Sequence, residues 1–201
     1  MAVLIFLHGS NSSPEDCHDV SAAAQENGVH CVLPRGRLSD EGSWSWFGSS
    51  DRGVDEASIQ ESITQVVAVV HACRQDAGVP SEPIMLAGFS QGAAMALSAC
   101  AVLGDEVDGL VMMSGFVPES TRWAPDLTKL SGMNVTILHG MADEIVDPLI
   151  AQDLADTLQR VGAAVTTHVG HYGHVRNPES IAVLMDVMVN CQRGGDTTPQ
   201  R

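Results

Sequence analysis

One stretch of this sequence constrains the fold more than any other, because it joins a short apolar run to a helix through a serine flanked by glycines. Residues 84–87 form an apolar run of strand length, and residues 88–92 read Gly-Phe-Ser-Gln-Gly. Residues 93–100 are rich in Ala, Leu and Met, which predicts a buried helix. A strand, a sharp turn and a helix are the context in which a Gly-x-Ser-x-Gly pentapeptide exposes its serine at the carboxyl end of a sheet.

The two glycines predict how tight this turn is. A Cβ atom at Gly88 or Gly92 would collide with the neighbouring strand or helix, so we expect both positions to require glycine. Ser90 would then lie on a strained turn at a helix N-terminus, where unpaired N–H groups favour developing negative charge. The structural alternative is a tight turn in which Ser90 serves as an ordinary N-cap.

Apolar runs of strand length alternate with helical patterns along the chain. The strand-like runs are residues 3–7, 29–33, 84–87, 107–113, 134–138 and 163–169. The helical patterns are residues 13–27, 55–77, 93–100, 147–161 and 177–191. Short unbroken apolar strands separated by helices predict a parallel sheet that is covered on both faces. We therefore expect an α/β fold with a compact doubly wound parallel sheet of about six strands, its first strand central, and no cap domain.

Length and composition limit the other possibilities. The chain has 201 residues, enough for one domain with a substantial core, and we expect that domain over residues 1–193 with a disordered tail over residues 194–201. We interpret residues 35–54 as a long irregular loop. A net charge of −15 argues against nucleic acid or an anionic membrane surface as a partner.

Cysteine usage points to a reducing compartment. The five cysteines are odd in number and none forms a Cys-x-x-Cys pair, which predicts reduced, buried side chains in a cytoplasmic protein. The sequence shows no signal peptide and no apolar run of membrane-spanning length. We therefore expect a cytoplasmic protein without stable membrane association.

Polar residues follow the predicted strands at the carboxyl edge of the sheet, where doubly wound proteins have their ligand-binding and active sites. Ser90 follows the third strand, Asp143 follows the fifth, and three histidines lie in or after the sixth. Ser, Asp and His in this chain order are typical of α/β-hydrolases. In such a triad an imidazole takes the serine proton, and a carboxylate holds the imidazole in the correct tautomer.

The candidate base is one of three histidines. His168 belongs to the sixth strand, and His171 lies too close to the end of that strand to reach across the edge. His174 follows Gly173 on a loop, where the backbone has the freedom to turn. We therefore expect His174 to be the base, with His171 as the alternative. The three histidines together with Asp143 could instead bind zinc, but that would leave the serine turn unexplained, so we expect no metal.

A tetrahedral intermediate also needs two N–H donors for its oxyanion. One would be the backbone N–H of Gln91, directly after Ser90. The other would be the backbone N–H of Ser10, in the turn after the first strand, where Gly9 lets the chain bend. Since both donors belong to the main chain, the side chains of Ser10 and Gln91 should be partly dispensable.

Three polar residues near the same edge have simpler interpretations. His8 and His139 precede glycines at strand ends, and we interpret both as structural hydrogen-bonding residues. Asp147 precedes Pro148 at a predicted helix start, which favours an N-cap role.

Together these motifs resemble the phospholipase/carboxylesterase family of small α/β-hydrolases, which includes acyl-protein thioesterases. The resemblance is carried by residues 7–9, 46–47, 88–93, 138–143, 146–148, 173–174 and 178–179. It implies an α/β-hydrolase fold, a Ser90–Asp143–His174 triad, an oxyanion hole at Ser10 and Gln91, and catalysis without a cofactor.

The resulting functional hypothesis is a serine hydrolase that cleaves carboxylic esters through an acyl-enzyme intermediate. It could be a carboxylesterase, a lysophospholipase or an acyl thioesterase, acting on a small-molecule acyl ester or thioester as a monomer or homodimer. We expect Trp46, Phe47 and Phe116 to contact the substrate. Two alternatives remain: a catalytically silent binding module, and a cofactor-free lyase or peroxidase that uses the same triad on the same fold.

Overall fold

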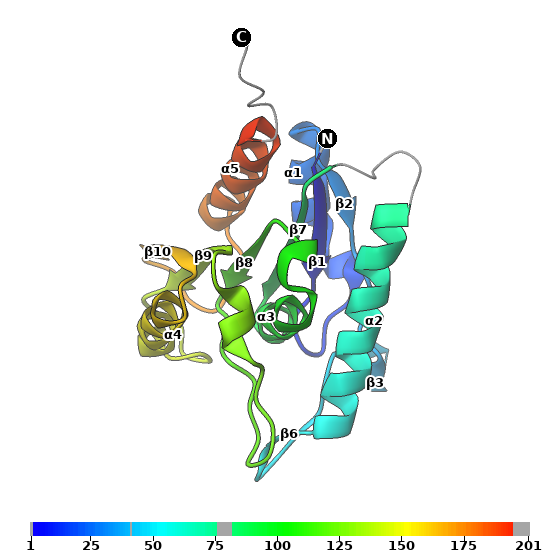
Figure 1. Cartoon of the computed structure of the whole chain (residues 1–201), viewed down its shortest axis with the longest axis vertical. Coiled ribbons are helices and arrows are strands. Elements are labelled where there is room, and N and C mark those ends of the chain that lie inside the picture. The colour runs from blue at the N-terminus through cyan, green and yellow to red at the C-terminus, as the bar shows by residue number, and fades with distance from the viewer. Residues whose placement is uncertain (1, 41, 76–81, 195–201) are drawn as a thin grey trace.

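A parallel sheet of six strands forms the centre of the computed structural model, which describes residues 2–40, 42–75 and 82–194 (Figure 1). The strand order is β10-β9-β8-β7-β1-β2, and every neighbouring pair is parallel. The strands are β1 (Val3–Leu7), β2 (His30–Val32), β7 (Ile84–Phe89), β8 (Gly109–Met113), β9 (Asn134–Gly140) and β10 (Ala164–Gly170). The predicted parallel sheet of about six strands is confirmed.

Helices cover both faces of the sheet. They are α1 (His18–Glu26), α2 (Glu56–Gln75), α3 (Gln91–Leu103), α4 (Pro148–Arg160) and α5 (Pro178–Gly194), with a short 3-10 helix, η1 (Pro14–Cys17), leading into α1. Apolar residues of α1 and α5 belong to one core cluster, and those of α2, α3 and α4 belong to the other. Figure 1 shows α5 and α2 on opposite sides of the sheet. The predicted end of the second helix at residues 76–77 lies outside the described residues. Of the tail predicted over residues 194–201, Gly194 is instead the last residue of α5, and residues 195–201 lie outside the described residues.

The two cores explain why the strands are unbroken apolar runs. Every residue of β1 is buried, and successive side chains of a strand point to opposite faces. Val3, Ile5 and Leu7 accordingly belong to the core under α2, α3 and α4. Leu4 and Phe6 belong to the core under α1 and α5.

The first strand is not central, which corrects our expectation. β1 lies one strand in from the edge formed by β2, and its other neighbour is β7. The chain adds β2 on one side of β1, then crosses over and adds β7, β8, β9 and β10 on the other. The direction of strand addition therefore reverses between β1 and β7, and crevices that bind ligands form at the carboxyl ends of strands at such a point.

The predicted irregular loop at residues 35–54 contains two short antiparallel pairs. β3 (Leu38–Asp40) pairs with β4 (Ser43–Ser45), and β5 (Ser49–Ser50) pairs with β6 (Gly53–Val54). Strands of two or three residues are too short to show an alternating apolar pattern, so they could not be predicted from the sequence.

Within the described part of the chain, no helix combines the length and apolarity needed to cross a membrane.

Candidate active site

Ser90 occupies a sharp turn between strand and helix. β7 ends at Phe89 and α3 begins at Gln91, so Ser90 is the one residue between them. Its φ of 54° and ψ of −119° are unusual for a residue with a side chain and mark a strained backbone. Ser90 stands at the N-cap position of α3, but its side chain makes no capping hydrogen bond. The hydroxyl is therefore not used as an ordinary N-cap.

The glycines on either side of Ser90 are required by close backbone contacts. A Cβ atom on Gly88 would run into the backbone of Gly92 at the start of α3. A Cβ atom on Gly92 would run into the carbonyl oxygens of Leu7 and His8 at the end of β1. Both predicted collisions are confirmed. The absence of a side chain at Gly88 and Gly92 therefore lets the turn between β7 and α3 pack directly against the end of β1.

Asp143 lies in the turn after β9, and its side chain is completely buried. Its Oδ1 accepts hydrogen bonds from the backbone N–H groups of Ile145 and Val146, each at 2.9 Å. Its Oδ2 accepts a hydrogen bond from Nδ1 of His174 at 2.8 Å. The carboxylate is thus fixed on one side by its own turn and bonded on the other to a histidine 31 positions away.

The environment of Asp143 keeps it ionised. Burial alone would raise the pKa of this carboxyl, but hydrogen bonds from Val146, His174, Ile145 and the Ser114 side chain together hold its pKa below the ordinary value. Ser114 follows β8 directly and has a φ of 48°, another left-handed backbone at this edge. The sequence places Ser114 at the edge but gives no indication that it bonds the carboxylate.

Of the three candidate histidines, His174 is the one that the structure brings to Asp143. It lies on the loop between β10 and α5, and its side chain is 16% exposed. Its ring packs against the ring of Phe89 at 4.8 Å between centroids, which places it beside the residue that precedes Ser90. His168, on β10, and His171 are exposed.

The hydrogen bond between His174 and Asp143 leaves Nε2 of the ring as the atom that can accept a proton. Among the described residues, no hydrogen bond joins this ring to the Ser90 hydroxyl. Such bonds are often long in a structure without substrate and tighten when substrate is bound.

Ser10 and Gln91 lie at the ends of neighbouring strands. Ser10 follows β1 and is exposed, and the next residue, Asn11, has a φ of 51°. Gln91 opens α3, and the first N–H groups of a helix have no partner within it. The Gln91 side chain, in contrast, is fully engaged. Its Oε1 accepts the N–H of Trp46 and its Nε2 donates to the carbonyl of Phe47, each at 2.8 Å.

Trp46 and Phe47 are buried beneath this turn. Trp46 is completely buried, and its indole N–H donates to the carbonyl of His8 at 2.8 Å. Phe47 is 4% exposed. Both side chains belong to the core packed against α2 and α3. These contacts give them a structural role, and their contact with substrate stays a prediction.

Phe116 lines an apolar cavity of about 640 Å³. Ile145, Val146 and Ile150 line the same cavity, on the side of the turn after β9 and of α4. Since the N–H groups of Ile145 and Val146 bond Asp143, this cavity lies against the turn that holds the carboxylate, although the residues that line it do not include Ser90, Asp143 or His174.

The other histidines at this edge support the backbone. His8 is buried, its Nδ1 donates to the carbonyl of Gly9 at 2.7 Å, and its Nε2 accepts the Gly36 N–H at 3.0 Å. Burial lowers the pKa of His8, which keeps Nε2 an acceptor. His139 is also buried, with Nε2 2.9 Å from the carbonyl of Val146. The structural interpretation of both histidines is confirmed.

Asp147 caps α4, as predicted. Its side chain accepts a hydrogen bond from the Leu149 N–H at 2.9 Å, and Pro148 is the first helical residue. Across the described residues, no three His, Cys, Asp or Glu side chains are grouped so that they could hold a metal ion.

Comparisons with known proteins agree with this fold. The family model of the phospholipase/carboxylesterase family matches residues 1–191. A protein named acyl-protein thioesterase 1 from Debaryomyces hansenii is 28% identical over 181 residues, covering 80% of this chain and 78% of the relative. An acyl-protein thioesterase 1 homolog from Dictyostelium discoideum is 27% identical over 200 residues, covering 91% and 87%.

Solved structures share the architecture. A carboxylesterase from Mesorhizobium loti superposes with a TM-score of 0.81 at 23% identity, covering 92% of this chain and 87% of that one. Acyl-protein thioesterase 2 from Zea mays superposes with a TM-score of 0.76 at 18% identity, covering 95% and 94%. At these identities the two structures establish the α/β-hydrolase fold.

Proposed function

Because this chain belongs to the phospholipase/carboxylesterase family of α/β-hydrolases, we propose that it hydrolyses carboxylic esters or thioesters with Ser90, His174 and Asp143 as its catalytic triad. The observation that carries this proposal is the hydrogen bond from His174 Nδ1 to Asp143 Oδ2 at 2.8 Å, beside the strained turn that holds Ser90. Because this bond occupies Nδ1, it leaves Nε2 of the imidazole free to accept the proton of the Ser90 hydroxyl.

The first half of the reaction forms an acyl-enzyme. Nε2 of His174 takes the proton from the Ser90 hydroxyl, and the Ser90 oxygen attacks the carbonyl carbon of the substrate. The carbonyl oxygen becomes an oxyanion, which the N–H groups of Ser10 and Gln91 stabilise. When the tetrahedral intermediate collapses, the bond to the leaving oxygen or sulfur breaks, and His174 gives its proton to the departing alcohol or thiol.

The second half repeats these steps with water. His174 takes a proton from a water molecule, the resulting hydroxide attacks the acyl carbon, and Ser90 leaves with the proton returned by the imidazole. Throughout, Asp143 stays ionised and stabilises the imidazolium that forms twice in each cycle. The lowered pKa of Asp143 suits this role.

The apolar cavity beside Asp143 is the candidate site for the acyl group. Phe116 and Ile150 contribute apolar walls, and a volume of about 640 Å³ is enough for an acyl chain of several carbons. We therefore favour a substrate whose acyl part is apolar, and the relatives named acyl-protein thioesterases support the same class.

We propose a cytoplasmic location for the reaction. Cys17, Cys31, Cys100 and Cys191 are free thiols in the structure, which is typical of proteins in a reducing compartment.

The test is turnover of 4-nitrophenyl esters of increasing chain length by the purified protein. Ser90→Ala should lower kcat by on the order of 10⁴-fold with an unchanged melting temperature, since triad residues act as a unit. Ser98→Ala is the matched control, because Ser98 lies on α3 and its hydroxyl bonds the carbonyl of Ala94 at 2.9 Å. A fluorophosphonate probe should label Ser90. Labelling of another serine, or a Ser90→Ala variant with a tenth of wild-type turnover, would contradict the proposal.

A further inference from the structure

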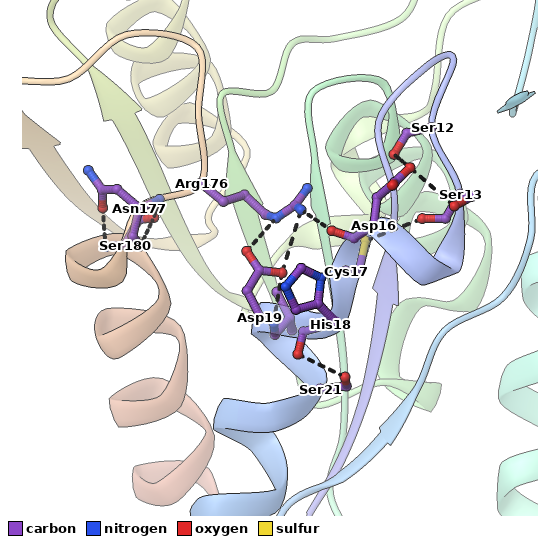
Figure 2. A network of polar contacts seen from close by, with 11 residues as sticks. Ser12, Ser13, Asp16, Cys17, His18, Asp19, Ser21, Arg176, Asn177 and Ser180 are labelled. Atoms are coloured by element: carbon purple, nitrogen blue, oxygen red, sulfur yellow. Dashed lines mark hydrogen bonds and ion pairs between the residues drawn. The ribbon is translucent and has the colours of Figure 1, made fainter.

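Arg176, two positions after His174, connects the loop of the proposed base to residues near the N-terminus of the chain. Arg176 reaches from this loop to η1 and α1, as Figure 2 shows. Its Nε donates to Oδ2 of Asp19 at 3.2 Å, and its Nη2 donates to the carbonyl of Asp16 at 2.6 Å. The Arg176 side chain is 14% exposed and that of Asp19 is 31% exposed, so the ion pair is partly shielded from water.

The same guanidinium supports the aromatic ring on which His174 rests. It lies over the ring of Phe89 at 5.4 Å and over the ring of Phe6 at 5.9 Å. The Phe89 ring in turn packs against the imidazole of His174 at 4.8 Å. Phe89 therefore contacts both side chains, and it is the residue that precedes Ser90.

The loop that carries His174 is short, running from residue 171 to residue 177 between β10 and α5. Before His174, the Tyr172 carbonyl accepts the N–H of Ala142 at 3.0 Å. The side chain of His174 itself is fixed by its hydrogen bond to Asp143. The next residue, Val175, is 50% exposed, and Arg176 then makes the contacts with Asp16 and Asp19.

We propose that Arg176 is a positioning residue for the imidazole of His174, a role that rests on the proposed triad. Its ion pair with Asp19 fixes the part of the loop that follows His174. Its contact with Phe89 fixes the surface against which the imidazole packs. The result is that Nε2 is held at the Ser90 turn before any substrate binds. Preorganisation of this kind matters because a displacement of about 1 Å can lower a rate about a hundredfold.

The experiment compares Arg176→Gln with wild type in kcat, KM and melting temperature, using a 4-nitrophenyl ester. Glutamine keeps a hydrogen-bond donor but loses the charge and the planar guanidinium. We expect kcat to fall by about tenfold or more, with KM changed by less than about twofold, because misplacing the base affects the chemical step. Arg176→Lys should recover part of the loss, since its ammonium can still pair with Asp19 and lie over Phe89.

Arg74→Gln is the matched control. Arg74 is 28% exposed, and its Nη2 pairs with Asp108 at 3.1 Å and donates to the carbonyl of Glu106 at 3.0 Å. Arg74 lies on α2. Asp108 directly precedes β8, at the amino ends of the parallel strands, whereas Ser90 follows β7 at their carboxyl ends. Arg74→Gln should lower the melting temperature without lowering kcat.

A second set of variants tests whether Arg176 acts through His174. In the background of His174→Ala, adding Arg176→Gln should lower the residual kcat by less than about twofold, because the group being positioned is gone. Asp19→Asn removes the charge at the other end of the ion pair, so it should lower kcat in the same direction even if Arg176→Gln does not fold.

The outcomes separate this inference from the proposed triad. If His174→Ala is nearly inactive while Arg176→Gln and Asp19→Asn keep kcat within about threefold of wild type, the ion pair is only structural and the inference is wrong. Equal losses from Arg176→Gln in the wild-type and His174→Ala backgrounds would also overturn it. If His174→Ala keeps wild-type activity, the proposed triad itself fails.

Discussion

The side-chain amide of Gln91 holds the backbone of Trp46, accepting its N–H at 2.8 Å across 45 positions of sequence. The same amide donates to the carbonyl of Phe47. Gln91 thereby couples Trp46 and Phe47, which lie between β4 and β5, to the start of α3 directly after Ser90. The sequence alone predicts a partly dispensable Gln91 side chain, whereas these two bonds indicate that the side chain supports the site.

Gln91→Ala should therefore lower the stability of the protein more than Ser10→Ala. Loss of the amide leaves the Trp46 N–H and the Phe47 carbonyl without their partner, which should lower the free energy of unfolding by about 1–3 kcal/mol. Ser10→Ala should lower kcat less than about tenfold, since the proposed donor at Ser10 is its backbone N–H. Urea denaturation and steady-state kinetics of both variants measure these effects. Equal stability of the two variants would show that the amide bonds contribute little.

Two aspartates four positions apart should differ sharply in their effect on turnover. Asp143→Asn should lower kcat by about 10³-fold or more, because an amide allows the wrong imidazole tautomer. Asp147→Asn should leave kcat within about twofold, because asparagine caps a helix about as well as aspartate. Steady-state kinetics with matched melting curves decide between them, and the reverse order of effects would reassign the acid of the triad.

Alanine substitution of the three histidines should identify the base. His174→Ala should lower kcat by on the order of 10⁴-fold, whereas His168→Ala and His171→Ala should stay within about threefold of wild type. The reason is that His174 bonds Asp143, while His168 and His171 are exposed. A His171→Ala variant that loses activity, beside an active His174→Ala variant, would refute this assignment.

The buried thiols of Cys17 and Cys100 and the partly buried thiol of Cys31 should resist thiol reagents at pH 8. Burial raises the pKa of Cys17 to about 11 and that of Cys31 to about 12, and it pushes the pKa of Cys100 well above its ordinary range. Since the thiolate is the reactive form, these thiols should react far more slowly with iodoacetamide in the folded protein than in urea. Mass spectrometry after timed labelling measures each site. Rapid labelling of Cys100 without denaturant would show that this part of the core opens.

The sheet was predictable because its strands are buried on both faces. Residues 3–7 read as an unbroken apolar run since alternate side chains serve two different cores. The sharp turn was predictable as well, because the contacts of Gly88 and Gly92 leave room for hydrogen but not for a methyl group. These constraints act between residues that are close in the sequence, so a short stretch of sequence is enough to predict them.

The contacts that arrange the candidate site are not local. Arg176 meets Asp19 across 157 positions, and no spacing or periodicity in the sequence relates them. The place of β1 in the sheet also depends on which side the chain crosses after β2, which the strand pattern does not encode. Trp46 lies in a region with no apolar periodicity. The sequence allows it to cover the core, but it does not show that Trp46 bonds His8 and Gln91.

The backbone of Ser90 sets reactivity against stability. A serine at φ 54° is strained, and at the N-cap of α3 its hydroxyl forgoes a capping bond of about 1 kcal/mol. Glycine would relieve the strain at this position while removing the proposed nucleophile. A Ser90→Gly protein should then be inactive yet more resistant to heat than the wild type. Selection for thermal stability alone would thus tend to remove the proposed nucleophile, and activity has to be selected alongside stability.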